Sequence, residues 1–381
     1  MTASLLLKGF EIELFTGRAS GENVGIAAEA ARSLPGFVTE PDNRNIEYIT
    51  APVADYAPLT EALLAPRRQL RQWLETRSLT LLPGSTLSLG NPDQFERSDP
   101  GNAYHSLIEA TYGTRVVTAS IHINLGINDT TALFTALRLI RCEAALLLAL
   151  SASSPFLGGT VTGAHSQRWL QFPLTPSCVP LFHDHQHYIN WVDEQLQAGA
   201  MHNVRHLWTS VRPNGPNRPH HLNRLELRIC DLITDPALLL AVTTLLELRV
   251  LMALEAPDNL DPLCVSQLSP RQLQQLSDRN DAAAAQSSLD ASLHHWRDGR
   301  ALLCRDWIAE LCTAVTPLAD KLGLQQQLDP IHRVLQDGNQ AMRWLAAVNA
   351  GAALPDVLQA EIHTMADQER SSAAKQTGIL G

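Results

Sequence analysis

Apolar and polar residues alternate along four short segments of the chain, at 9–14, 45–50, 120–127 and 223–230. Successive side chains of a β-strand point to opposite faces, so this period predicts four strands that each have one apolar and one polar face. We expect these strands to pair in an antiparallel sheet whose apolar side is buried. The predicted apolar side carries Phe10, Ile12, Leu14, Ile121, Ile123, Leu125, Ile127, Leu225, Leu227 and Ile229.

The opposite face of the predicted sheet concentrates charged and polar side chains. They are Glu11, Glu13, Glu47, His122, Asn124, Arg224, Glu226 and Arg228. Same-face neighbours on a strand lie about 6.6 Å apart, so carboxylates at this density repel one another unless cations lie between them. Several glutamates supply the hard oxygen ligands that Mg²⁺ or Mn²⁺ prefers. The pattern predicts a divalent-metal site, and the alternative is an ordinary solvated face of an antiparallel sheet.

Helical periodicity and breaker residues organise the rest of the chain. We expect helices at 23–33, 58–77, 131–149, 188–198, 270–276, 290–315, 329–349 and 354–365. Pro66 is expected to kink or split the second of these. A strand interrupted by Pro83 and Gly84 is expected at 79–89. The segment 208–219 is rich in proline and glycine, so we expect an exposed loop that suits neither a strand nor a helix.

This order of elements predicts one α+β domain over residues 1–381. Residues 1–235 would form the sheet with the active site on its polar face. Residues 236–365 would form a helical portion packed on the apolar face. The segment 366–381 is polar, and we expect it to be a frayed tail.

Composition narrows the classes of function. The formal net charge of −10 argues against a nucleic-acid binder, because phosphate contacts need a basic surface. Six cysteines are scattered without a C-x-x-C pair, so we expect reduced, mostly buried thiols. The first residues lack the pattern of a signal peptide, which predicts a cytoplasmic protein. The apolar stretch at 144–150 is too short to span a membrane, and the stretch at 236–254 is interrupted by charges. We therefore expect no membrane span.

Five motifs in order along the chain carry a family resemblance. They are Gly-Phe-Glu-Ile-Glu at 9–13, Ile-Glu-Tyr-Ile-Thr at 46–50, His-Ile-Asn-Leu-Gly-Ile at 122–127, Leu-Ser-Ala-Ser-Ser-Pro-Phe at 150–156 and Arg-Leu-Glu-Leu-Arg-Ile-Cys-Asp at 224–231. This set resembles glutamate–cysteine ligases, in particular the bacterial carboxylate–amine ligases and the form found in cyanobacteria. The resemblance implies a glutamine-synthetase-like fold, with helices on one face of the sheet and a metal and ATP cleft on the other.

The resemblance also implies roles for individual residues. The implied metal ligands are Glu11, Glu13, Glu40, Glu47, His122 and Glu226, of which Glu40 is not indicated by alternation. Glu226 and Arg228 are expected to be catalytic, with Arg228 neutralising charge on the transferred phosphoryl group. The residues expected to contact substrate or ATP are Asn124, Arg212, Arg224 and Arg228. Relatives often have a histidine where this chain has Asn124, which puts a phosphate contact there in question, although an amide still donates a hydrogen bond.

The implied reaction joins the γ-carboxylate of L-glutamate to the amine of L-cysteine through a γ-glutamyl phosphate, with ATP as phosphoryl donor and Mg²⁺ or Mn²⁺ as cofactor. The expected partners are therefore small molecules, and the sequence leaves a homo-oligomer open. One alternative is the same chemistry with a different amine. Alternatives from other classes are a metal-dependent hydrolase and a non-catalytic metal-binding protein.

Three further groups of residues have a structural interpretation beside a functional one. Arg212 and Arg218 either bind anionic substrates or are ordinary loop arginines. The histidines at 183–187 resemble a zinc patch but lack a cysteine partner. The serines at 151–154 are expected to end a helix, because no G-x-S-x-G motif surrounds them.

Overall fold

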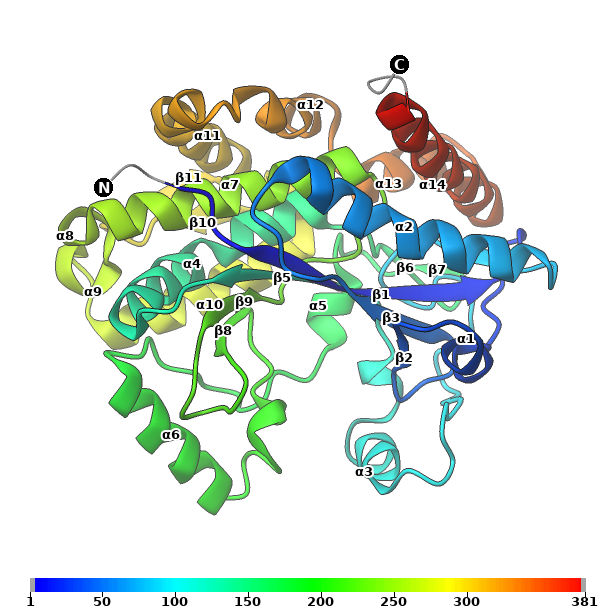
Figure 1. The fold of residues 1–381 in the computed structure, drawn as a ribbon, viewed down its shortest axis with the longest axis horizontal. Helices are drawn as coiled ribbons and strands as arrows, with labels where there is room; N and C mark the ends of the chain where they lie inside the picture. Colours follow the sequence, from blue (N-terminus) through cyan, green and yellow to red (C-terminus); the bar gives the residue numbers. More distant parts are fainter. Residues whose placement is uncertain (1–3, 378–381) are drawn as a thin grey trace.

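A seven-stranded antiparallel sheet forms the centre of the protein. The structure is a computed structural model that describes the backbone of residues 4–377 and the side chains of residues 4–371. The strand order is β2-β3-β1-β5-β9-β8, and β4 pairs with the end of β1. The strands are β1 (Lys8–Gly17), β2 (Phe37–Thr39), β3 (Asn45–Ile49), β4 (Thr80–Leu82), β5 (Ile121–Gly126), β8 (Val211–Asn214) and β9 (Arg224–Leu227). Figure 1 shows an upper layer of long helices above the sheet, with α3 and α6 on the lower side.

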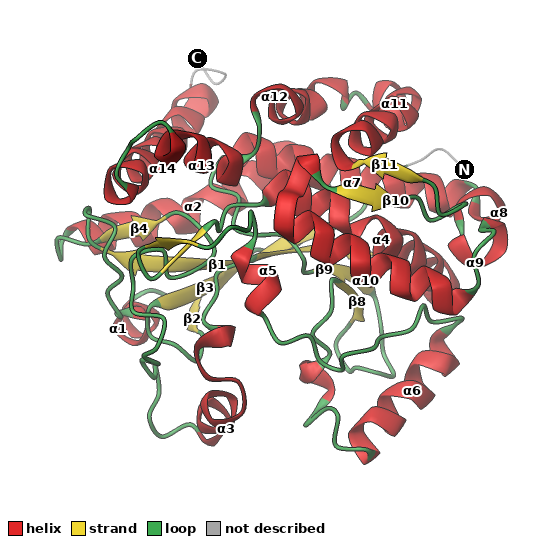
Figure 2. Ribbon diagram, turned by 180° about the vertical axis from the view of Figure 1, so that it is seen from behind, coloured by secondary structure: helices red, strands yellow, loops and turns green. Residues whose placement is uncertain are grey.

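The predicted apolar face of the sheet is the core of the molecule. All ten apolar residues expected on that face belong to one buried cluster. Long helices cover it, as Figure 2 shows from behind. They are α2 (Tyr56–Glu75), α4 (Thr130–Ser151), α7 (Pro236–Glu255), α10 (Pro270–Ser287), α11 (Cys304–Leu322), α12 (Asp329–Asp337), α13 (Gln340–Asn349) and α14 (Leu354–Thr377). The α+β class and the helical layer on the apolar face are therefore confirmed.

Short elements complete the fold. The remaining helices are α1 (Ala27–Ser33), α3 (Ala103–Tyr112), α5 (Gln167–Gln171), α6 (His185–Gln197), α8 (Pro257–Leu260) and α9 (Pro262–Val265). Two small hairpins pair β6 (Phe156–Leu157) with β7 (Thr160–Val161), and β10 (Ser292–His294) with β11 (Ala301–Leu303). Helices α3 and α6 border the polar face of the sheet.

Helix α7 is long and apolar enough to span a membrane, and it is the one such helix among the described residues. Within the fold, 83% of its most apolar window is buried. The two charges that interrupt its sequence are both paired. Glu247 lies 3.1 Å from Lys8 Nζ and accepts a 2.7 Å hydrogen bond from Tyr56, while Arg249 pairs with Glu143 at 2.7 Å.

Several predicted boundaries are wrong. Residues 211–214, expected in an exposed loop, form the buried strand β8; Pro213 is tolerated because β8 is an edge strand. The segment 290–315 is not one helix, since β10 and β11 precede α11. The expected helix at 329–349 is divided at Gly338, whose φ is +86°. Two helices are longer or more regular than predicted: α2 continues through Pro66 without a break, and α10 extends to Ser287.

The expected frayed tail is also corrected. Helix α14 continues to Thr377, and Glu369 within it is only 1% exposed. Its carboxylate lies 2.8 Å from Arg67 Nε and 2.5 Å from Arg71 Nε. Both arginines belong to α2, so a buried ion-pair cluster joins α14 to α2 at Glu369. Residues 378–381 of the predicted tail lie outside the described residues.

Candidate active site

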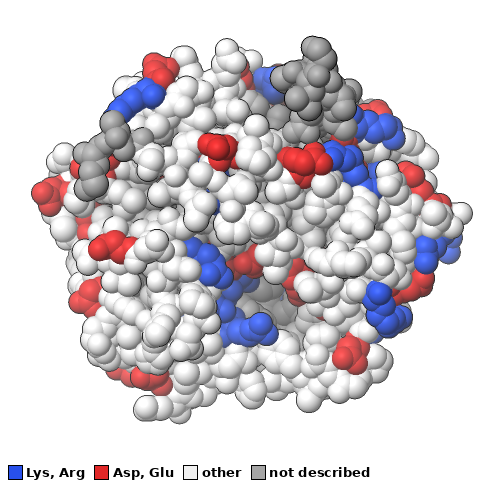
Figure 3. Space-filling view, in the orientation of Figure 1, with Lys and Arg blue, Asp and Glu red and all other residues white. Residues whose placement is uncertain are grey.

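A cavity of about 940 Å³ opens on the polar face of the sheet. Its walls come from β1, β2, β3, β5 and β9 and from the segments that contain α3 and 204–218. Figure 3 shows a hollow in the lower middle of the molecular surface as seen in the orientation of Figure 1, with basic and acidic side chains next to one another around it. The polar sides of all four predicted strands therefore meet at one concave site.

The acidic wall of the cavity comes from the first strands. Strand register places Glu13 opposite Glu47 on β3 and places Glu11 opposite His122 on β5. Glu40, just beyond β2, lines the same cavity. Alternation brings Glu11, Glu13, Glu47 and His122 to one face because they occupy same-side positions of neighbouring strands, whereas Glu40 comes from the segment after β2.

Glu11, His122 and Glu226 form the one group of at least three potential metal ligands among the described residues whose ligand atoms converge. One ligand atom from each lies within 4.8 Å of the others. His122 Nδ1 is 2.9 Å from Glu11 Oε2 and 3.8 Å from Glu226 Oε1. Two carboxylates and an imidazole at this spacing can surround a divalent cation.

A second set of carboxylates, Glu13, Glu40 and Glu47, lies on the same wall. Burial, and then the negative charge of Glu13, raise the pKa of Glu40 to about 8. Burial and repulsion from Glu40 and Glu13 raise the pKa of Glu47 to about 10. Glu13 itself accepts a 2.8 Å hydrogen bond from Ser120. Carboxylates crowded in this way favour either protonation or a bound cation.

The opposite wall of the cavity is basic. Its arginines are Arg168, Arg205, Arg212, Arg218, Arg224 and Arg228. Arg212 Nε and Nη2 donate to the two oxygens of the fully buried Glu226, at 2.8 and 2.9 Å, and Arg228 Nη1 donates to the same carboxylate at 2.5 Å. Burial alone would raise the pKa of Glu226, but the charges of Arg212 and Arg228 hold it well below its ordinary value. Glu226 is therefore ionised and joins the two walls.

Asn124 occupies an orienting position between the walls. Its Nδ2 donates to Glu11 Oε1 at 3.1 Å, and its Oδ1 accepts from Arg224 Nε at 3.1 Å. A neutral amide can donate a hydrogen bond to a carboxylate and accept one from a guanidinium at the same time, since it has both a donor and an acceptor. Asn124 and Arg224 therefore form a chain of contacts that ends at Glu11.

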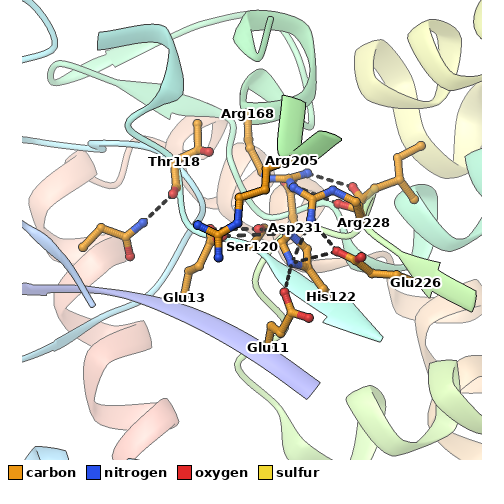
Figure 4. A network of polar contacts seen from close by, with 12 residues as sticks. Glu11, Glu13, Thr118, Ser120, His122, Arg168, Arg205, Glu226, Arg228 and Asp231 are labelled. Carbon is orange, nitrogen blue, oxygen red and sulfur yellow. Dashed lines mark hydrogen bonds and ion pairs between the residues drawn. The ribbon is translucent and has the colours of Figure 1, made fainter. Parts of the chain in front are cut away.

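Sequence reasoning missed Arg168, Arg205, Ser120 and Asp231, which Figure 4 shows beside the predicted residues. Arg168 is buried and donates to the carbonyl oxygens of Arg228 and Ile229, at 3.0 and 2.9 Å. Asp231 lies 3.9 Å from Arg168. Arg168 lies in the five-residue helix α5 and Arg205 in a single 3-10 turn between α6 and β8, and elements this short show no periodicity that singles out a side chain.

The serines that follow α4 are explained by Asp231. Ser154 Oγ donates to its Oδ2 at 2.7 Å, and the backbone N–H of Ser153 donates to the same oxygen at 2.9 Å. Ser151 Oγ accepts from the Asp231 N–H at 3.2 Å. These contacts join the fourth motif of the sequence to the end of the fifth and give the serines a structural role.

The histidines at 183–187 form no convergent metal group in the described part of the chain. His183 and His187 stack with ring centroids 5.1 Å apart, and Asp184 caps α6 by accepting from the His187 N–H. His185 Nε2 contacts the Pro219 carbonyl at 2.8 Å. These contacts give the segment a structural role in α6 and in the loop between β8 and β9.

The sequence and the fold have known counterparts. The profile of glutamate–cysteine ligase family 2 (GCS2) matches residues 7–370. A protein of Thermobifida fusca is 26% identical over 340 residues, covering 87% of this chain and 81% of its own. A protein of Leifsonia xyli is 28% identical over 269 residues, covering 69% and 68%. Both bear the name "Putative glutamate--cysteine ligase 2".

Two solved structures share the fold. Glutamate–cysteine ligase from Francisella tularensis, in complex with AMP, superposes with a TM-score of 0.74 at 14% identity, covering 99% of this chain and 95% of its own. A bifunctional glutathione synthetase from Pasteurella multocida gives 0.71 at 13% identity, and 53% of its chain is covered. The fold is therefore that of the glutamine-synthetase-like ligases.

The family match supports a ligase, and the solved structures show that the chain has the fold of such enzymes. The chain belongs to glutamate–cysteine ligase family 2.

Proposed function

We propose that the protein is an ATP- and Mg²⁺-dependent ligase that joins the γ-carboxylate of L-glutamate to the amine of L-cysteine through a γ-glutamyl phosphate. The observation that carries this proposal is the division of one 940 Å³ cavity into a carboxylate wall and an arginine wall. The carboxylate wall would bind the Mg²⁺ that accompanies the nucleotide, and the arginine wall would bind the phosphates of ATP and the carboxylates of glutamate.

The donor set fits a magnesium site. Glu11, His122 and Glu226 converge, and the crowded Glu13, Glu40 and Glu47 supply further oxygen ligands on the same wall. We propose these six residues as the metal ligands. When bound, Mg²⁺ would neutralise charge on the β- and γ-phosphates.

The reaction asks for positioning and charge neutralisation rather than for a nucleophilic side chain. A γ-carboxylate oxygen of glutamate forms a bond to the γ-phosphorus of ATP, and ADP leaves. The amine nitrogen then forms a bond to the acyl carbon, loses its proton, and releases phosphate. We assign Arg228 to neutralise charge on the transferred phosphoryl group, since it borders both walls and is fixed by Glu226.

The other arginines are assigned to binding or to support. Arg212 uses its donors on Glu226 and on the carbonyl of Leu207 at 2.9 Å, so we assign it to hold Glu226 in place. Arg218 lines the cavity, and its Nη1 has no hydrogen-bond partner among the described residues. Arg218 is therefore the better candidate to bind a phosphate or carboxylate of a substrate.

The comparisons support the reaction class. The matched family is named for glutamate–cysteine ligation, and the Francisella enzyme of the same fold binds AMP. The identity of the amine rests on the family name alone, so a carboxylate–amine ligase with another acceptor is the second candidate.

Release of ADP by the purified protein tests this proposal. The assay contains Mg²⁺, ATP and L-glutamate, with or without L-cysteine, and mass spectrometry identifies the product. We expect ADP release that depends on cysteine and a product with the mass of γ-glutamylcysteine. ADP release that depends on a different amine would support the proposed mechanism but show that the acceptor is not L-cysteine. An absence of release with every amine tested would contradict the ligase proposal and favour a hydrolase or a non-catalytic metal-binding role.

A further inference from the structure

Tyr104 of α3 lines the active-site cavity and is half-buried. Its hydroxyl lies 2.9 Å from Nε2 of His206, which is only 2% exposed. The centroids of the two rings are 5.6 Å apart. His206 belongs to the 3-10 turn at 204–206, so this contact joins α3 to the segment between α6 and β8.

The direction of this hydrogen bond follows from the other ring nitrogen of His206. The backbone N–H of His202 donates to His206 Nδ1 at 3.3 Å, so Nδ1 carries no proton. Burial, and then the neighbouring His202, lower the pKa of His206, so its ring is neutral near pH 7 and holds its one proton on Nε2. Nε2 therefore donates to the Tyr104 oxygen, and the proton of the Tyr104 hydroxyl is left for another acceptor.

The surroundings of the Tyr104 hydroxyl favour an acceptor that a substrate supplies. The part of the chain that the structure describes offers its proton no acceptor within hydrogen-bond distance. Burial raises the pKa of Tyr104, so the hydroxyl remains a donor at neutral pH. Arg205 lowers that pKa and Glu40 raises it, and both residues line the cavity. The hydroxyl is therefore within electrostatic range of the basic wall and of the acidic wall.

We propose that Tyr104 is a substrate-binding residue whose hydroxyl donates a hydrogen bond to a carboxylate or phosphate oxygen, and that His206 is the positioning residue that orients this hydroxyl. The inference rests on the proposed function for the identity of the ligands. The contact with His206 argues against a proton relay from the acceptor amine through Tyr104, because Nε2 already holds a proton and cannot take a second one from the hydroxyl.

Calorimetric titrations of the full-length protein test this proposal without requiring turnover. The ligands are the non-hydrolysable ATP analogue AMPPNP, L-glutamate and L-cysteine, each added in the presence of Mg²⁺ and of the other two. AMPPNP carries the phosphates and the two amino acids carry the carboxylates, so the ligand whose affinity changes identifies the group that Tyr104 contacts. We expect Tyr104→Phe to weaken the binding of one ligand at least tenfold, since it removes a hydrogen bond to a charged group.

Tyr112→Phe is the matched control. Tyr112 is on the same helix, its ring centroid is 6.4 Å from that of His206, and within the described residues it is not part of the cavity lining. This variant should bind all three ligands as wild type does.

Two substitutions of His206 test the positioning role. His206→Leu removes the donor and should weaken the ligand that Tyr104→Phe weakens. His206→Gln can still donate from its side-chain amide and should keep most of the affinity. In the Tyr104→Phe background, His206→Leu should have no further effect, because the hydroxyl that it orients is already absent.

Thermal unfolding checks that each variant keeps its fold. Equal affinity of Tyr104→Phe and wild type for all three ligands would overturn the assignment of Tyr104, as would an equal loss in Tyr112→Phe or a wild type that binds none of the ligands. Additive losses in the double variant, or equal losses in His206→Gln and His206→Leu, would overturn the role of His206. If wild type binds the ligands but releases no ADP with any amine, the ligase reaction is contradicted, while the titrations still decide the assignment of Tyr104.

Discussion

Arg212 donates hydrogen bonds to both carboxylate oxygens of Glu226, with Nε 2.8 Å from Oε2 and Nη2 2.9 Å from Oε1. The two residues are direct partners in the register of β8 and β9, and both are buried. This pair keeps Glu226 ionised at the junction of the acidic and basic walls. Arg212 is therefore part of the framework of the site, whereas Arg218, on the loop that follows β8, lines the cavity, and its buried Nη1 has no hydrogen-bond partner among the described residues.

Substitution of these two arginines should separate stability from binding. Arg212→Ala leaves Glu226 buried with one partner fewer, so we expect a loss of about 3–5 kcal/mol of folding stability. Arg218→Ala should change stability by less than about 0.5 kcal/mol. It should raise KM for ATP or glutamate about 10- to 100-fold, since a hydrogen bond to a charged group contributes about 1.5–3 kcal/mol. Urea unfolding and initial rates measure the two effects, and equal destabilisation by both substitutions would contradict the assignment.

Removal of single carboxylates from the acidic wall should impair turnover while the fold persists. Glu11 and Glu13 have side chains that are 19% and 13% exposed, so glutamine at either position is tolerated sterically. We expect Glu11→Gln and Glu13→Gln to lower kcat about 10²- to 10³-fold and to raise the Mg²⁺ concentration for half-maximal rate. Glu22→Gln, on an exposed ion pair with Arg18, is the matched control. Normal Mg²⁺ dependence in Glu13→Gln would remove Glu13 from the ligand set.

The sheet and most of its polar face follow from alternation alone, because the period of two in β1, β3, β5 and β9 is a local property. Strand β8 could not be predicted in the same way. Pro213 argues against a strand until the strand order shows that β8 is at the edge, where a missing N–H leaves no ladder bond unmade. The alternating pattern does not include Glu40 or Arg168. Glu40 follows β2 and Arg168 lies in the short helix α5, and only tertiary structure brings these two segments to the cavity.

Stability should depend on pH and Mg²⁺ together. The pKa values of Glu40 and Glu47 are raised from 4.5 to about 8 and about 10. Between pH 4.5 and those values the folded state binds more protons than the unfolded state, so stability is highest at low pH within this window and falls as pH rises. Mg²⁺ requires ionised carboxylates, so the increase in Tm that it gives should be larger at pH 8 than at pH 5.5.

The variant Glu47→Gln is a control for the predicted dependence of stability on pH and Mg²⁺. At pH 8 Glu47 is protonated in the folded protein and ionised in the unfolded chain, so glutamine removes the free-energy cost of taking up that proton on folding. Without Mg²⁺ at pH 8 we therefore expect Tm to rise by roughly 2–4 °C, the shift that about 1 kcal/mol produces in domains of 150–250 residues. The variant should also gain less from Mg²⁺ than wild type. Differential scanning fluorimetry at both pH values measures these shifts, and an equal Mg²⁺ effect at pH 5.5 and pH 8 would argue against a cation on this wall.

The end of α14 should be essential for stability although it is polar in sequence. Glu369 is the shared partner of Arg67 and Arg71, and Arg67 also donates to the Thr234 carbonyl at 2.7 Å. Glu369→Ala leaves two buried guanidinium groups without their carboxylate, so we expect a loss of about 3–5 kcal/mol. Asp367→Ala, two residues earlier on the same helix, breaks only an exposed pair with Arg370 and should cost less than about 1 kcal/mol. Urea unfolding of the two variants makes the comparison, and equal stability would show that α14 does not anchor the helical layer through this cluster.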